Sequence, residues 1–87
     1  MAPKLLTSAQ IRAARALIRW SAEDLARETA QSVATIRRAE LTEDETSMNV
    51  ANDLAVRRAL EAAGVEFIDN GSGPGVRLRR AARPKSS

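Results

Sequence analysis

The stretch SAEDLARETAQSVATIRRAE, residues 21–40, decides the fold that this sequence predicts. Ser21 opens an S-x-x-D pattern, in which the serine hydroxyl accepts a hydrogen bond from an unpaired backbone N–H and the acid lies at the positive end of the helix dipole. Ser32 is a second N-cap candidate, and behind it Ile36 and Ala39 recur at helical spacing on one face. The stretch therefore predicts two short helices that meet at a tight turn.

The apolar residues of this stretch are spaced so that the second helix can pack across the first. They belong to the pattern L-A-x-x-x-x-x-S-x-x-T-I-x-x-x-E, which resembles the helix-turn-helix of the phage-repressor-like, or XRE-type, family of small bacterial regulators. The matching residues are Leu25, Ala26, Ser32, Thr35, Ile36 and Glu40. The resemblance implies a mainly α, four- to five-helix, lambda-repressor-like domain, in which the second helix of the pair lies in the major groove of DNA.

The resemblance also implies which residues contact DNA, or a partner that binds the same surface. Arg38 is the best candidate to bind guanine, because a guanidinium can donate two hydrogen bonds to O6 and N7. Hydroxyls or backbone N–H groups at the two helix starts would contact phosphates. The groove-facing positions are Val33, Ala34, Arg37 and Arg38, and the remaining candidates are Ser21, Ala22, Ser32 and Thr35.

Three positions depart from the pattern of this family. Ala22 stands where the family usually has a glutamine that helps to hold a DNA phosphate. Ala30 and Gln31 stand where the family usually turns on glycine followed by an apolar residue. A left-handed Ala30 in place of glycine costs on the order of 1 kcal/mol, which a packed domain can absorb. We therefore expect these changes to affect the DNA contacts more than the fold.

The residue inventory excludes several classes of protein. The 87 residues leave room for one small domain. The sequence has no cysteine and no histidine, which excludes disulfides, thiolate zinc sites, cysteine nucleophiles and imidazole acid–base chemistry. We expect a protein that is not an enzyme and that has no cofactor, metal site or small-molecule ligand. No apolar run approaches the roughly 20 residues that span a bilayer, so we expect a cytoplasmic protein without membrane contact.

The positive charge of the chain is concentrated at its end. The net charge is +3, but five of the 14 basic residues lie at positions 77–87 and all 11 acidic residues lie before them. The part of the chain up to position 76 therefore carries nine basic and 11 acidic residues, a net charge of −2. Phosphate binding depends on cations along the contact surface, so DNA binding would rely on local arginines and the tail rather than on bulk charge.

Capping and periodicity predict a first helix over residues 8–19. Thr7 is its N-cap candidate, and Gln10 three residues later completes a capping-box pattern. Apolar side chains recur on one face of this helix and arginines on the other, which is expected to be solvated. The apolar set is Ile11, Ala14 and Ile18 with Ala13, Leu17 and Trp20 beside them, and the arginines are Arg12, Arg15 and Arg19.

A longer helix is expected to begin near Ser47 or Asn49 and to end near Ala63, because Gly64 supplies a C-terminal stop. Its apolar side is expected to serve as core and dimer scaffold. The residues of that side are Val50, Leu54, Val56, Ala59, Leu60 and Ala63.

The last third of the sequence predicts a β-hairpin. Residues 65–68 and 76–79 alternate as strands do, and residues 70–74 between them have the composition of a turn. Residues 59–68 and 73–78 are also similar to the C-terminal part of many short members of the same regulator family. A lone hairpin leaves unpaired edges, so we expect a homodimer formed through the last helix and the hairpin.

An acidic cluster follows the second helix of the pair. Its residues, Glu43, Asp44 and Glu45, either face solvent or oppose DNA.

Taken together, these elements predict a single helical domain with three short additions, which are an arm, a hairpin and a tail. The expected parts are an N-terminal arm at 1–6, a helix-turn-helix domain at 7–64, a dimerising hairpin at 65–80 and a disordered basic tail at 81–87.

Two functions agree with these patterns. The leading interpretation is a small bacterial transcriptional regulator, a repressor for example, that binds double-stranded operator DNA as a homodimer. The alternative is an antiactivator that uses the same helix face to bind and inhibit a transcription activator. The acidic body, the acidic cluster and Ala22 favour this alternative. An antitoxin that represses its own operon would combine both roles.

Overall fold

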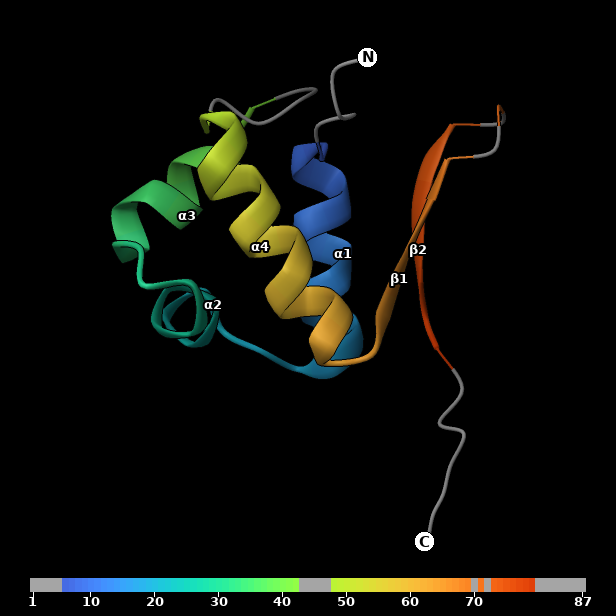
Figure 1. Ribbon diagram of the computed structural model, residues 1–87, viewed down its shortest axis with the longest axis horizontal. Helices are drawn as coiled ribbons and strands as arrows, with labels where there is room; N and C mark the ends of the chain where they lie inside the picture. Colours follow the sequence, from blue (N-terminus) through green and yellow to red (C-terminus); the bar gives the residue numbers. More distant parts are fainter. Residues whose placement is uncertain (1–5, 43–47, 70, 72, 80–87) are drawn as a thin grey trace, which may run out of the picture.

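The computed structural model describes residues 6–42, 48–69, 71 and 73–79. These residues form four helices and two strands, which are in chain order α1 (Ser8–Ile18), α2 (Ala22–Thr29), α3 (Val33–Ala39), α4 (Val50–Ala62), β1 (Val65–Asp69) and β2 (Pro74–Leu78). Figure 1 shows α3 at one end of the molecule and the hairpin at the other, with α1 and α4 between them in this view. The expected mainly α fold with a C-terminal hairpin is confirmed in this form.

Each of the four helices begins at a side-chain cap. Thr7 and Gln10 form the predicted capping box of α1, and Ser21 forms one with an aspartate at the start of α2. Ser32 accepts from the backbone N–H three residues later at the start of α3, as Asn49 does at the start of α4. These caps satisfy N–H groups that have no partner within a helix, so local sequence sets all four starts.

Two helices end on left-handed residues that are not glycine. Arg19 follows α1 with a φ of 60°, and Ala30 follows α2 with a φ of 55°. The N–H of Gln31 donates to the carbonyl of Ala26 at 2.9 Å, which closes the end of α2. The left-handed Ala30 that the sequence suggests is therefore present, and it turns the chain from α2 into α3.

The core takes side chains from every helix and from the first strand. Leu25 and Ala26 of α2 and Ile36 and Ala39 of α3, through which α3 was expected to pack on α2, all lie in this core. Asp53 on α4 is also buried, and its Oδ2 accepts from the N–H of Leu6 at 2.9 Å, which fixes the segment before α1. The buried apolar side chains are Leu6, Ile11, Ala14, Ala22, Leu25, Ala26, Ile36, Ala39, Met48, Val56, Leu60 and Val65.

The apolar stripes of two helices are narrower than predicted. Ala13 and Leu17 on α1 are exposed, and Val50 at the start of α4 is 46% exposed. Ile18 and Trp20 are half-buried and pack against the core. The buried side chains of α1 are those of Ser8, Gln10, Ile11 and Ala14, so the covered face of this helix does not extend to Ala13 and Leu17.

The hairpin packs against α1 through one of its faces. Phe67 of β1 pairs with Val76 of β2, and both side chains pack against the core. On the opposite face Glu66 and Arg77 form an ion pair at 2.6 Å. The side chain of Gln10 on α1 donates to the carbonyl of Gly75 at 3.1 Å. The predicted hairpin is confirmed, with its second strand two residues earlier than expected at its start.

Some predicted features fall outside the described residues. These are residues 1–5 of the N-terminal arm predicted at 1–6, the acidic cluster Glu43, Asp44 and Glu45, and the basic tail at 81–87. Among the helices that the structure describes, none has the length and apolar character that crossing a membrane requires.

The left-handed turn generates a stability prediction. Replacing Ala30 with glycine removes the steric cost of a positive φ, so Ala30→Gly should raise the free energy of unfolding by about 1 kcal/mol. Ala13→Gly, at an exposed position in the middle of α1, should lower it by about 1 kcal/mol. Urea unfolding measures both. Destabilisation by Ala30→Gly would contradict a left-handed turn at that residue.

Candidate nucleic-acid interface

Helix α3 is held by one face and exposed on the other. Ile36 and Ala39 are 0% and 1% exposed, and they lie in the core beside α2. The hydroxyl of Ser32 accepts from the N–H of Thr35 at 3.1 Å, which caps the start of the helix. Ala34 is exposed on the outer side. A helix this short has little stability of its own, so its position depends on what surrounds it.

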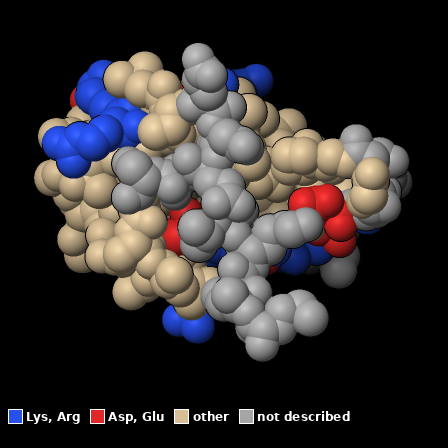
Figure 2. Space-filling model, turned by 90° about the horizontal axis from the view of Figure 1, so that it is seen from above, with Lys and Arg blue, Asp and Glu red and all other residues tan. Residues whose placement is uncertain are grey.

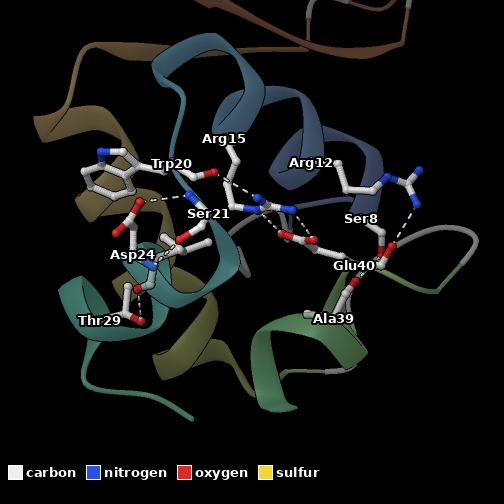
Figure 3. A network of polar contacts seen from close by, with 10 residues as sticks. Ser8, Arg12, Arg15, Trp20, Ser21, Asp24, Thr29, Ala39 and Glu40 are labelled. Atoms are coloured by element: carbon white, nitrogen blue, oxygen red, sulfur yellow. Dashed lines mark hydrogen bonds and ion pairs between the residues drawn. The ribbon is translucent and has the colours of Figure 1, made fainter. Parts of the chain in front are cut away.

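An ion pair between α1 and the residue that follows α3 fixes the far end of α3 (Figure 3). Arg15 donates from Nε and Nη2 to the two carboxylate oxygens of Glu40, at 2.6 and 2.7 Å. Its third nitrogen donates to the carbonyl of Trp20 at 2.9 Å, so one guanidinium joins α1, the link to α2 and the end of α3. The hydrogen bonds to Glu40 raise the pKa of Arg15 above its ordinary value.

Two further contacts from α1 reach the same end of α3. Arg12 donates to the backbone carbonyl of Glu40 at 2.8 Å. The buried hydroxyl of Ser8 donates to the carbonyl of Ala39 and also contacts the hydroxyl of Thr42. The prediction that the arginines of α1 form a solvated face is therefore wrong for Arg15, which is half-buried and paired with Glu40. Arg12 is exposed as predicted, although its guanidinium also donates to the end of α3.

The structure divides the candidate contact residues of α3 into two groups. Ala34, Arg37 and Arg38 are exposed and belong to the outer surface. Val33 is half-buried and packs against the core, so it offers less surface than the resemblance implies. Thr35 is half-buried too, and its hydroxyl lies 2.8 Å from that of the capping serine.

The candidates at the helix starts differ in a similar way. Ser21 and Ser32 are exposed caps, and each hydroxyl accepts from a backbone N–H, while the hydroxyl of Ser32 also lies 2.8 Å from that of Thr35. Ala22 is 7% exposed, so its side chain belongs to the core and only its backbone could meet a partner. The buried position explains why a small apolar residue fits there.

The charges around α3 are largely paired. Arg37 donates to Glu23 on α2 at 2.7 Å, with both side chains more than half exposed. Arg27 pairs with Asp24 at 2.7 Å. The side chain of Arg38, in contrast, makes no hydrogen bond or ion pair with any residue that the structure describes. Arg38 is thus the basic group of α3 that can bind a partner without breaking an existing contact.

Two carboxylates lie at the start of α2. The pKa of Glu23 is lowered, first by a hydrogen bond from its own backbone N–H and then by Arg37. The pKa of Asp24 is lowered, first by the backbone N–H of Ser21 that completes the capping box, at 2.9 Å, and then by its arginine. Both groups are therefore ionised at neutral pH, and they occupy the positive end of α2 where a phosphate would otherwise bind.

In Figure 2 basic side chains gather at the end that carries α2 and α3, with a large uncharged area beside them. Metal binding has no support from the described residues, since no three of their acidic side chains lie together as a metal would require. The surface is suited to contacts made by arginine, small apolar groups and hydroxyls.

Comparison with known proteins adds no assignment. No protein-family model matches the chain, and no curated protein matches it.

Sequence reasoning missed the two residues that position this surface. In the sequence Glu40 is noted only as the final residue of the pattern that resembles a helix-turn-helix, and Arg15 lies on the face of the first helix that is expected to be solvated. Their contact joins residues 25 positions apart, so neither helical spacing nor a local cap could indicate it. Glu40 follows the apolar positions Ile36 and Ala39 on the same face of α3, so its carboxylate is buried and needs a cation nearby. That need is the signal that could have indicated an arginine partner on α1.

Breaking this ion pair should loosen α3. Glu40→Gln leaves the partly buried guanidinium of Arg15 without a counter-charge, and it should lower the free energy of unfolding by about 2 kcal/mol. Glu61→Gln is the matched control, because Glu61 pairs with Arg57 at 3.3 Å in a more exposed position and should change stability by less than about 0.5 kcal/mol. If urea unfolding shows the same loss of stability for Glu40→Gln and Glu61→Gln, the ion pair of Glu40 does not hold α3 more strongly than an exposed pair would.

Proposed function

We propose that this protein is a transcriptional regulator that binds duplex DNA, with α3 placed in the major groove as the recognition helix of a helix-turn-helix. The observation that carries the proposal is a short helix whose inner face is buried and whose outer face offers an unpaired arginine, Arg38. A helix in this arrangement fits the width of the major groove, where base edges carry a distinct pattern of donors and acceptors.

The exposed side chains have separate roles in this proposal. Arg38 donates two hydrogen bonds to a guanine, and the methyl group of Ala34 contacts a thymine methyl. The hydroxyl of Ser32, at the start of α3, donates to a phosphate beside the groove. Arg37 binds a base or a phosphate after release from Glu23. Base contacts thus come from few positions of α3, which favours a short recognition sequence per copy.

One observation favours the antiactivator as a second candidate. Glu23 and Asp24 carry negative charge at the start of α2, and phosphates are repelled by such groups whereas a basic protein surface is attracted. The exposed Ala34 would then pack against an apolar side chain of a transcription activator. The two candidates use the same face, so an experiment with DNA of defined sequence separates them.

Substitution of Arg38 tests base recognition. Duplexes selected from a random pool by the wild-type protein should share a guanine, and Arg38→Ala should weaken binding to them by about 1–3 kcal/mol while relaxing the preference at one base pair. Arg58→Ala on α4 is the matched control, since Arg58 is also exposed and should leave the preference unchanged. A pool without any enriched sequence, or an equal loss on every duplex, would contradict base reading by Arg38.

Substitution of Glu23 tests the orientation of the surface toward phosphates. Glu23→Gln frees Arg37 and removes a negative charge, so affinity for the selected duplex should rise severalfold and the slope of log affinity against log salt should steepen by about 1. Glu66→Gln frees Arg77 in the same way at the hairpin and should have no such effect. Fluorescence anisotropy at several salt concentrations measures both variants. If Glu23→Gln and Glu66→Gln change the affinity and the salt dependence of binding equally, then α2 and α3 do not face DNA.

A further inference from the structure

Leu41 lies just beyond the end of α3 and is the most exposed large apolar side chain among the described residues. Its exposed fraction is 80%, whereas Leu17, Val50 and Leu78 are 39%, 46% and 52% exposed. Single exposed apolar side chains are common on protein surfaces and need no function by themselves. The position of Leu41 relative to Arg38 therefore decides whether it has one.

Leu41 continues the outer face of α3. The N–H of Glu40 donates to the carbonyl of Ile36 at 3.1 Å, and the N–H of Leu41 donates to the carbonyl of Arg38 at 3.2 Å. The helical path thus extends to Leu41 with a tighter last turn. Residues four and seven positions apart lie on one face of a helix, so Leu41 shares the outer face with Ala34 and Arg38.

The peptide group that precedes Leu41 is held from α1 (Figure 3). Its carbonyl, which is that of Glu40, accepts a hydrogen bond from Arg12 at 2.8 Å, while the carboxylate of Glu40 is paired with Arg15. Leu41 is therefore attached to an anchored part of the backbone, and a contact residue held in this way loses less conformational entropy on binding. The guanidinium of Arg12 also places positive charge beside this peptide group, which suits a surface that approaches phosphates.

The proposed function puts this outer face in the major groove of DNA, and the groove limits what Leu41 can contact. The base edges there present hydrogen-bond donors and acceptors, and the C5 methyl of thymine is the apolar group among them. The side chain of leucine neither donates nor accepts, so it gains free energy by removing apolar surface from water. The thymine methyl is the group in the groove that meets this requirement.

The spacing along the helix indicates where such a thymine lies. Arg38 and Leu41 are three residues apart, which is about 4.5 Å along a helix axis, and successive bases of one strand are about 3.4 Å apart. A guanine bound by Arg38 and a methyl packed against Leu41 are therefore one or two base pairs apart. Ala34 lies about 6 Å from Arg38 in the opposite direction, so its thymine lies on the other side of the guanine.

We propose that Leu41 is a specificity-determining residue, whose side chain packs on the C5 methyl of a thymine one or two base pairs from the guanine that Arg38 binds. This role rests on the proposed function, because it requires α3 in the major groove. It adds a base position to those read by Ala34 and Arg38, and it extends the recognition sequence beyond the residues of the helix itself.

Removal of the methyl group alone tests this contact. Each thymine of a duplex selected by the wild-type protein is replaced in turn by deoxyuridine, which lacks the C5 methyl and keeps the hydrogen-bonding groups of the base. At one position near the guanine, this change should weaken wild-type binding about fourfold, as expected for one buried methyl group. Leu41→Ala should bind the thymine and deoxyuridine duplexes of that position with equal affinity in fluorescence anisotropy.

Two variants serve as controls. Leu78→Ala removes another exposed leucine, from the hairpin at the other end of the molecule, and should keep the full dependence on the methyl group. Arg38→Ala should lose the guanine preference and still bind the thymine duplex more tightly than the deoxyuridine duplex. Leu41→Ala should unfold at the same urea concentration as the wild type, because the substituted side chain is exposed.

The outcomes distinguish a failure of this role from a failure of DNA binding. If no duplex is enriched from a random pool, the proposed function fails and the role of Leu41 fails with it. If a duplex is enriched and its binding depends on Arg38, but Leu41→Ala responds to the loss of each methyl group as the wild type does, base reading by α3 stands and the role of Leu41 is overturned.

Discussion

The ion pair between Arg15 and Glu40 is the interaction on which the α3 surface depends. Helix α3 is too short to be stable alone, and its fully buried side chains are Ile36 and Ala39, with Val33 packed against the core beside them. The pair fixes the end of this helix to α1, while the third nitrogen of the guanidinium fixes the chain at Trp20 before α2. One buried carboxylate thereby sets the position of α3 relative to the two helices that precede it.

The local features of the fold were predictable from the sequence because their signals are local. Each helix start follows a side chain that caps it, and the left-handed turn at Ala30 follows from the short distance between two capped segments. Two-residue alternation around a glycine-rich turn was enough to predict the hairpin. In these places the chemistry that determines the structure lies within a few residues of the place where it acts.

The features that sequence reasoning missed depend on contacts between distant segments. Arg15 could not be distinguished from the exposed Arg19 on periodicity, and Leu17 could not be distinguished from Ile18, because which side of α1 is covered is decided by the hairpin and α4. Among the candidate contact residues, the sequence could place Arg38 on the outer side of α3. It could not reveal that Ala22 is core or that Arg37 is paired with Glu23.

The distribution of charge shapes what the α3 surface can bind. Paired arginines and carboxylates on α2 and α3 cancel much of the local field, so a partner gains less from long-range attraction than from direct contacts. The side chain of Arg38 has no partner among the described residues, so a contact made through it would break no existing ion pair. The hairpin lies at the other end of the molecule from α3.

The most direct test of α3 as the recognition helix is an amide chemical-shift map of the full protein with and without a selected duplex. If α3 enters the major groove, the largest changes should fall on the amides of residues 32–38 and of Ser21 and Ala22, with smaller changes along β1 and β2. Changes confined to residues 80–87, or spread over α4 and the hairpin while α3 is unaffected, would contradict this role.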